Sequence, residues 1–181
     1  TATLGDAHTL AELVAINNAI SGTLTLNNYG VVLSGSTADV KAALAGSFAA
    51  AYTGHVILSD ANGISIAAAD ITTIEGNTSG TITVSNNINI TGTSAAITLA
   101  VGDVNTFSGT PTATLGDAHT LAELVAINNK ISGTLTLNDY SVALSGSTAD
   151  VKAALAGSFA AAYTGNVCLL YTSPSPRDLA Q

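Results

Sequence analysis

The sequence contains no tryptophan or methionine, and only one of its 181 residues is a cysteine. Aromatic residues make up 4% of the chain while 47% of it is hydrophobic, so most of its apolar side chains are aliphatic. A single cysteine excludes a framework of disulfides within the chain. Small aliphatic side chains favour thin, stacked layers of strand and short helix over a thick aromatic core.

Basic residues are also scarce. Lysine and arginine together number 4, against 12 aspartates and glutamates, which gives a formal net charge of −8. Because nucleic-acid phosphates and anionic membrane surfaces are bound by clusters of Lys and Arg, we expect neither to be a partner. No apolar run approaches the roughly 20 residues that span a bilayer, so we expect no membrane insertion.

What the sequence does contain is a long internal repeat. Residues 1–56 return as residues 112–167, shifted by 111 positions, and only five of the 56 positions differ. The differing pairs are Ala19/Lys130, Asn28/Asp139, Gly30/Ser141, Val32/Ala143 and His55/Asn166. A fixed long period is typical of repeat architectures, in which each unit packs against its neighbours.

A weaker two-fold similarity divides the first unit further. The pattern around Ser21–Leu26 resembles that around Ser79–Val84, and Leu33–Ala38 resembles Ile90–Ala95. We therefore divide residues 1–111 into four coils, at about 1–22, 23–54, 55–80 and 81–111. A second, truncated unit occupies residues 112–167. Because Thr1 is not an initiator methionine, we expect the sequence to be a fragment of a longer chain.

Each coil begins with a short alternating run such as TLTL or TITV, which predicts a half-buried strand. The apolar members of these runs are expected to face inward: Leu4, Leu24, Leu26, Val56, Leu58, Ile82 and Val84. Helical patterns follow at residues 9–16, 40–48 and 67–74. Thr9 and Glu12 have the spacing of a capping box, as do Thr120 and Glu123. Residues 96–107 fit a helix or a strand, and extra strands are expected at residues 31–34 and 88–91.

Strands that alternate with helices across tight turns predict parallel strands joined by right-handed crossovers. We therefore predict an α/β repeat solenoid, with one stacked parallel sheet, short helices opposite it and the extra strands at a corner. The alternative is an all-β solenoid.

The last residues depart abruptly from the repeat. Residues 168–178, CLLYTSPSPRD, resemble the translation of a transposon-type sequencing adapter, and the whole stretch 168–181 is expected to be a non-native tail. The alternative is a genuine Pro-rich tail. On the adapter interpretation, Cys168 is neither a nucleophile nor a metal ligand.

The first candidate site is a set of carboxylates. Asp6, Asp60 and Asp117 all follow a predicted strand and could form a column of calcium sites, because calcium prefers oxygen ligands. One aspartate per turn supplies few ligands, and the glycine-rich calcium-binding nonapeptide is absent from the sequence. We favour the interpretation that each aspartate bonds the backbone of its own turn. No cofactor is expected.

Two other sets of residues lack the partners that chemistry would need. His8, His55 and His119 have no second histidine or cysteine at ligand spacing, so we predict that they are surface residues and not metal ligands. The sequence also lacks a G-x-S-x-G elbow, a G-x-G-x-x-G loop and a Walker loop. We expect no catalytic residues and no enzyme activity.

Thr-x-Thr pairs at the strand starts are the second candidate site. If the strands stack in one sheet, the outward threonines would form a two-column lattice that resembles the ice-binding face of Thr-x-Thr solenoids. His55 and Ile57 interrupt this lattice in the third coil, and threonine is favoured on any exposed strand face. The members of this candidate binding face are Thr1, Thr3, Thr23, Thr25, Thr81, Thr83, Thr112, Thr114, Thr134 and Thr136.

The segments TLAELVAINNxISGTLTL and LSGSTADVKAALA resemble the Thr/Ala/Asx-rich tandem repeats of very large surface or secreted proteins of cyanobacteria and other aquatic bacteria. The resemblance implies an extracellular or cell-surface location and a structural, adhesin-like role as a repeat spacer, without catalysis. The alternative is a binding module that uses the threonine face for ice or glycan, or the aspartate turns for calcium. The expected partners are adjacent repeats of the same chain, with end-to-end self-association of the fragment.

Overall fold

The computed structural model describes residues 1–170 of the chain. Within that range it contains six α-helices and thirteen short β-strands, interspersed along the chain. The fold is therefore α/β, as the sequence predicts, and not all-β.

The helices are seven to ten residues long. They are α1 (Leu10–Ala19), α2 (Thr37–Leu44), α3 (Ala68–Glu75), α4 (Ser94–Asp103), α5 (Leu121–Asn128) and α6 (Thr148–Ala154). The strands have two to four residues each. They are β1 (Ala2–Thr3), β2 (Leu24–Thr25), β3 (Leu33–Gly35), β4 (Val56–Leu58), β5 (Ser65–Ala67), β6 (Ile82–Val84), β7 (Asn89–Gly92), β8 (Thr106–Phe107), β9 (Thr112–Leu115), β10 (Thr134–Thr136), β11 (Leu144–Gly146), β12 (Ser158–Phe159) and β13 (Val167–Leu169).

Side chains satisfy the free amides at the start of most helices, as their sequences predict. The hydroxyl of Thr9 accepts a hydrogen bond from the Glu12 amide at 3.3 Å, and a Glu12 carboxylate oxygen accepts one from the Thr9 amide at 2.8 Å. This reciprocal capping box recurs at Thr120 and Glu123. At α2 the hydroxyl of Ser36 accepts from the amide three residues later, and α6 begins in the same way. Each cap supplies an acceptor that an isolated helix lacks.

The fourth coil, which the sequence leaves open between helix and strand, contains both. Residues Ser94–Asp103 form α4, with the Thr93 hydroxyl accepting from the Ala96 amide at 3.2 Å. The short strand β8 follows the helix. The N-cap explains the start of this helix, because an uncapped segment of its length would be marginal in water.

All strand pairings in residues 1–170 are parallel, but the strands form four sheets and not the single sheet that we predicted. Their strand orders are β1-β2, β3-β4-β6-β8, β12-β10-β9-β7-β5 and β11-β13. The physical reason is that a coil carries strands in two different rows. For example, β6 pairs with β4 and the following β7 pairs with β5, so β6 and β7 belong to different sheets.

Paired strands are near neighbours along the chain. Partner residues are 22 positions apart where Ala2 faces Leu24, and 26 apart where Val56 faces Ile82. The other pairings fall between these two values. Each strand therefore pairs with the next turn of the chain and never with a distant segment of the described residues.

The predicted inward-facing residues lie in one continuous hydrophobic core that extends from Leu13 to Ala154. Six of the seven, all but Leu4, are at most 4% exposed. Leu4 is only half-buried, because it follows β1, whose only partner strand is β2. The core is a long thin layer that every coil extends.

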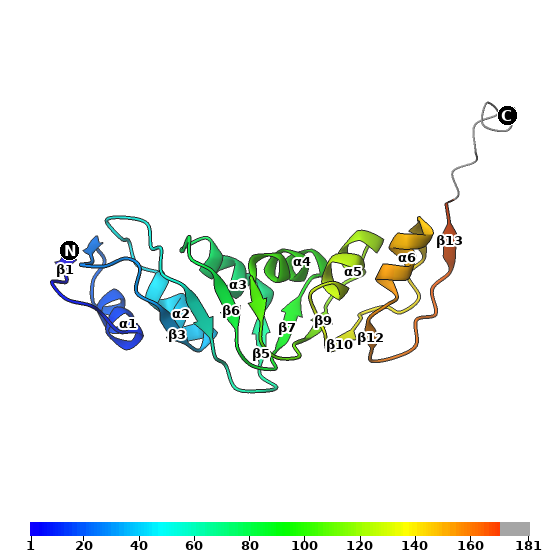
Figure 1. The fold of residues 1–181 in the computed structure, drawn as a ribbon, viewed down its shortest axis with the longest axis horizontal. Helices are drawn as coiled ribbons and strands as arrows, with labels where there is room; N and C mark the ends of the chain where they lie inside the picture. The colour runs from blue at the N-terminus through cyan, green and yellow to red at the C-terminus, as the bar shows by residue number, and fades with distance from the viewer. Residues whose placement is uncertain (171–181) are drawn as a thin grey trace, which may run out of the picture.

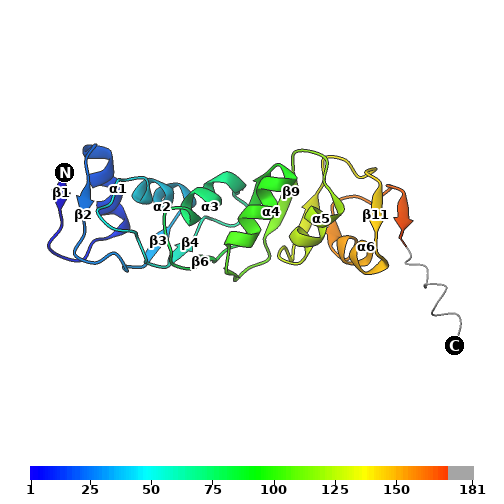
Figure 2. The same ribbon diagram turned by 90° about the horizontal axis from the view of Figure 1, so that it is seen from above.

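The arrangement of the helices follows from this nearest-neighbour pairing. Figure 1 shows α1 to α6 in chain order along the long axis, with the N-terminus at one end and β13 near the other. The view turned by 90° in Figure 2 shows the same progression. Among the described residues, no helix combines the length and apolar character needed to cross a membrane.

Candidate functional site

Seven of the ten threonines of the candidate binding face lie in strands of three different sheets, and Thr1, Thr23 and Thr81 lie just before β1, β2 and β6. Thr3 faces Thr25 in the sheet of β1 and β2, whereas Thr83 lies between Ile57 and Thr106 in the sheet of β4, β6 and β8. Of the ten, only Thr114 of β9 and Thr136 of β10 face each other in the longest sheet. The single continuous lattice that we expected is therefore absent from residues 1–170, because the strands do not share one sheet.

Within the longest sheet the polar side chains bond one another. Thr112 Oγ1 and Thr114 Oγ1 each lie 3.2 Å from Asn89 Oδ1, and both hydroxyls donate to it. Asn89 Nδ2 in turn donates to Ser65 Oγ at 3.1 Å. These contacts cross from β9 through β7 to β5 on one face. The hydroxyls therefore stabilise the stacking of the strands.

Asp60 is buried and engages the start of a helix in the preceding coil. Its two carboxylate oxygens are both 3.1 Å from the backbone nitrogen of Thr37, the first residue of α2, and one of them accepts from the Thr37 hydroxyl. Asp60 is only 8% exposed. The sequence-based interpretation, in which this aspartate bonds its own turn, is wrong about the partner, which lies 23 residues earlier.

Asp117 makes the equivalent contact two coils later. Its carboxylate accepts from the backbone nitrogen of Ser94, the first residue of α4, at 2.6 Å. Asp6, its counterpart in the first copy of the repeat, is exposed and has no hydrogen-bond partner within residues 1–170. The three aspartates are not brought together, and the described residues contain no group of three or more His, Cys, Asp or Glu side chains able to hold a metal ion. The carboxylates of Asp60 and Asp117 act as helix caps.

The prediction that His8 and His119 are surface residues is wrong. They are 4% and 3% exposed, respectively. His8 Nε2 lies 3.2 Å from the hydroxyl oxygen of Tyr52, and His119 Nε2 lies 3.0 Å from that of Tyr163. Each histidine packs against its tyrosine at a ring-centroid distance of about 6 Å. The error arose because the covering tyrosine is 44 residues away, beyond the reach of any local pattern.

The hydrogen bonds of this pair fix the histidine tautomer. The Tyr52 hydroxyl donates its only proton to the carbonyl oxygen of Val31 at 2.7 Å. It must therefore accept from His8 Nε2–H, which leaves Nδ1 unprotonated. Nδ1 of His8 and of His119 is buried and has no partner in the part of the chain that the structure describes.

Burial alters the pKa values of both members of the pair. It lowers the pKa of His8 and of His119, because the charged ring loses hydration, while nearby Glu12 and Glu123 act in the opposite direction. Burial also raises the pKa of Tyr52 to about 12. A neutral histidine next to a neutral tyrosine is thus the stable state near pH 7. The third histidine, His55, is exposed as predicted.

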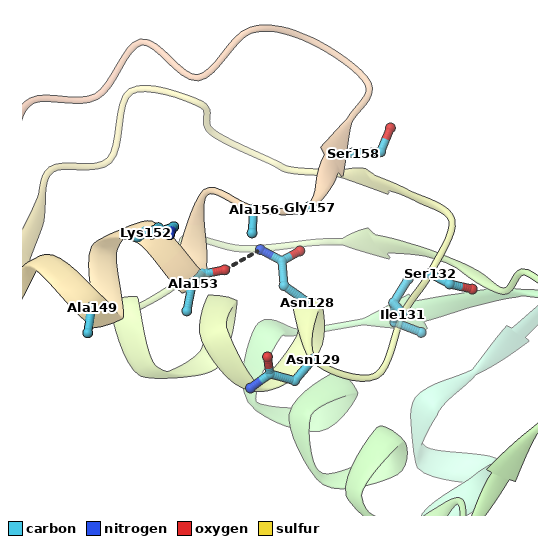
Figure 3. Close-up of a pocket in the computed structure, with 10 residues that line it drawn as sticks. All are labelled: Asn128, Asn129, Ile131, Ser132, Ala149, Lys152, Ala153, Ala156, Gly157 and Ser158. Atoms are coloured by element: carbon cyan, nitrogen blue, oxygen red, sulfur yellow. Dashed lines mark hydrogen bonds between the residues drawn. The ribbon is translucent and has the colours of Figure 1, made fainter.

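A cavity of about 700 Å³ lies between the C-terminal ends of α5 and α6 and the start of β12. In Figure 3 the Asn128 side chain extends from α5 toward the Ala153 carbonyl on α6. The lining contains one charged side chain, that of Lys152, and no histidine or carboxylate. The cavity thus lacks the paired acid and base that catalytic sites use.

Asn128 and its counterpart Asn17 are structural residues that sequence reasoning missed. Each side-chain amide donates to the last carbonyls of the neighbouring helix, which are those of Ala42 and Ala43 for Asn17. The last carbonyls of a helix lack partners from within it, and that of Ala42 also accepts from the Ala45 amide just after α2, at 3.4 Å. The only signal in the sequence is the occurrence of the same asparagine in both copies.

The described part of the tail is short. Cys168 is an exposed free thiol in β13, where it faces Ser145 of β11, and the remaining tail residues 171–181 lie outside the described residues. Comparison of the chain with protein-family models, with curated proteins and with solved structures found no match.

Proposed function

We propose that this chain is a structural spacer built as a repeat solenoid, part of a large extracellular or cell-surface, adhesin-like bacterial protein, with no catalytic role. The observation that carries the proposal is the strand register. Every described strand pairs in parallel with a strand 22 to 26 residues away, and the helices follow in chain order along one axis. A chain of this kind grows in length by adding coils.

The polar contacts between coils support a mechanical role. Asp60 caps the helix of the coil before it, Asn17 caps the C-terminal end of the helix after it, and Lys41 pairs with Asp70 of the next helix at 2.5 Å. Each of these side chains connects successive coils. These polar side chains therefore hold successive coils together.

The near-identity of the two copies also favours a spacer. A specific binding site would be a local departure from the repeat, yet the five differences between the copies are scattered over 37 positions, from Ala19 to His55 of the first copy. Repetition then supplies length. The location at the cell surface rests on the resemblance of the repeat to bacterial surface proteins.

Small-angle X-ray scattering tests the proposal directly. We expect the profile of a rod, and a maximum dimension that increases by a constant amount for each 111-residue unit added to the chain. A compact particle, or one whose maximum dimension grows only with the cube root of the chain length, would contradict the spacer function.

A binding surface is the second candidate, and one observation favours it. Thr114 faces Thr136 on one side and Thr91 on the other, which places three threonines in a row across β7, β9 and β10. Ice or a glycan would contact such a row. Ice recrystallisation assays and glycan binding of the native chain, compared with Thr114→Ala and Thr136→Ala, would test it. Equal behaviour of native chain and variants would exclude this surface.

A further inference from the structure

The same sequence occurs in two different surroundings within this molecule. Residues 36–46 and 147–157 are both STADVKAALAG, and each forms a capped helix, α2 or α6. In the first copy Thr37 and Val56 are 2% and 0% exposed. Their counterparts differ, because Thr148 is exposed and Val167 is 46% exposed. The second copy thus displays a surface that the first copy has covered.

The covering segment in the first copy is residues 59–84, which contains α3 and β6. Val56 N donates to the Thr81 carbonyl at 2.9 Å, and Ser79 N donates to the Tyr52 carbonyl at 2.9 Å. The first bond belongs to the pairing of β4 with β6, and the second to an isolated parallel bridge between Tyr52 and Thr78. The segment therefore lies on the first copy as the next parallel layer.

Two carboxylates of the covering segment contact the helix α2. Asp60 accepts from the amide and hydroxyl of Thr37, and Asp70 pairs with Lys41. Thr37 lies at the start of α2, and Lys41 lies in its last turn. The first copy thus contacts the covering segment through a sheet edge, through the amide at the positive N-terminal end of α2 and through the Lys41 ammonium group.

The second copy retains the groups that receive the strand and the two carboxylates, whereas His55, which accepts from the Thr81 amide at 3.1 Å, is replaced by Asn166. We define its docking face as Thr148, Lys152, Leu155, Tyr163 and Val167. These are the counterparts of Thr37, Lys41, Leu44, Tyr52 and Val56, and all five are identical between the copies. Within residues 1–170, the amides of Thr148 and Val167 and the amine of Lys152 have no hydrogen-bond partner on this side.

We propose that the docking face binds an α/β coil of the chemistry of residues 59–84. Its strand would pair in parallel with β13, and its two carboxylates would contact the Thr148 amide and Lys152. The occupant is a further segment of this same repeat, so the proposal rests on the spacer function. Beyond the spacer function, the proposal states that the docking face binds the next coil and names the side chains that contact it.

The test is an extended chain in which residues 168–181 are replaced by a copy of residues 57–111. Hydrogen exchange measured by mass spectrometry compares a peptide covering 148–167 with the peptide covering 37–56 in the same molecule. In the native chain we expect the 148–167 peptide to be less protected, and in the extended chain its protection to rise roughly tenfold, to the level of the other peptide. The 37–56 peptide reports whether the extended chain has folded.

Two variants of the extended chain test the chemistry. Lys152→Asp should lower the protection of the 148–167 peptide, and exchanging the appended counterpart of Asp70 for lysine should restore it. Unchanged protection of that peptide on extension would overturn the proposal. A second outcome would also overturn it: if the two peptides of the native chain were equally protected at high concentration but not at low concentration, the docking face would bind a second molecule. Failure of the rod-like scattering with docking intact would remove the spacer function alone.

Discussion

The Nε2 atom of His8 lies 3.2 Å from the hydroxyl oxygen of Tyr52, whose proton is donated to the carbonyl of Val31. This chain of contacts joins the loop before α1 to the segments before β3 and β4. The same contacts recur at His119, Tyr163 and Val142. Since neither histidine is accessible, the pair is part of the core.

Acid should destabilise the fold through this pair. A histidine whose pKa is lowered on folding binds fewer protons in the native than in the unfolded state, so the free energy of unfolding falls as the pH drops below about 6.5. The facing groups are Glu12 and Tyr52 for His8, and Glu123, Asp139, Asp117 and Tyr163 for His119. Urea denaturation midpoints at pH 7, 6 and 5 would measure the effect.

Replacing the buried histidines tests whether they cause the loss of stability in acid. His8→Phe together with His119→Phe should flatten the dependence between pH 7 and 5, whereas His55→Asn, at the exposed histidine, should leave it unchanged. A further loss below about pH 4.5 should persist in all variants, because Glu12 and Glu123 also have lowered pKa values. An unchanged slope in the double variant would contradict the assignment to histidine.

Tyr52→Phe should lower the free energy of unfolding by about 1–3 kcal/mol, because it leaves the Val31 carbonyl and the His8 N–H buried without partners. Tyr163→Phe is the matched comparison. Tyr52 is 1% exposed, whereas Tyr163 is only half-buried, so the second variant should lose less. Equal losses in chemical denaturation would show that burial does not set the size of the effect.

Asp60→Ala should cost about 1–2 kcal/mol, the usual value for the loss of a helix cap. Asp6→Ala should have almost no effect, since Asp6 is exposed and makes no hydrogen bond within the described residues. The thermal unfolding of both variants, followed by circular dichroism, gives the comparison. A calcium-dependent difference between them would favour the metal-site alternative.

Gly54 lies where two segments of the chain approach closely. A side chain there would clash with the carbonyl oxygen of Val31, whereas one at Gly5 would meet nothing within 4 Å. We expect Gly54→Ala to cost about 1–3 kcal/mol, as overpacked sites do. Gly5→Ala should stay within about 0.5 kcal/mol of the native chain. Similar melting temperatures for the two variants would contradict this.

Local signals predicted most elements of this fold. The capping boxes at Thr9 and Thr120 mark the starts of α1 and α5, because the bonding groups lie three residues apart in the sequence. The inward positions of Leu24 and Leu26 follow from period-two alternation. Such features depend on neighbours within a few residues, and a single sequence shows them.

The contacts that sequence reasoning missed all cross from one coil to another. Asp60 was assigned to its own turn because the spacing of 23 residues to Thr37 depends on how the coils stack. His8 was placed on the surface because its partner Tyr52 is 44 residues away in the sequence. The division of the strands into four sheets has the same cause, since alternation shows which side chains face inward but not which strands pair.

Pairing between strands 22 to 26 residues apart has a consequence for folding rate. Parallel sheets usually fold slowly, because long loops must close, at a cost in entropy, before the strands form any stabilising contact. Here each closure spans one coil, and its entropic cost stays the same however many coils the chain contains. Folding can begin at any coil and spread to its neighbours, so we expect longer versions of this chain to fold nearly as fast as short ones.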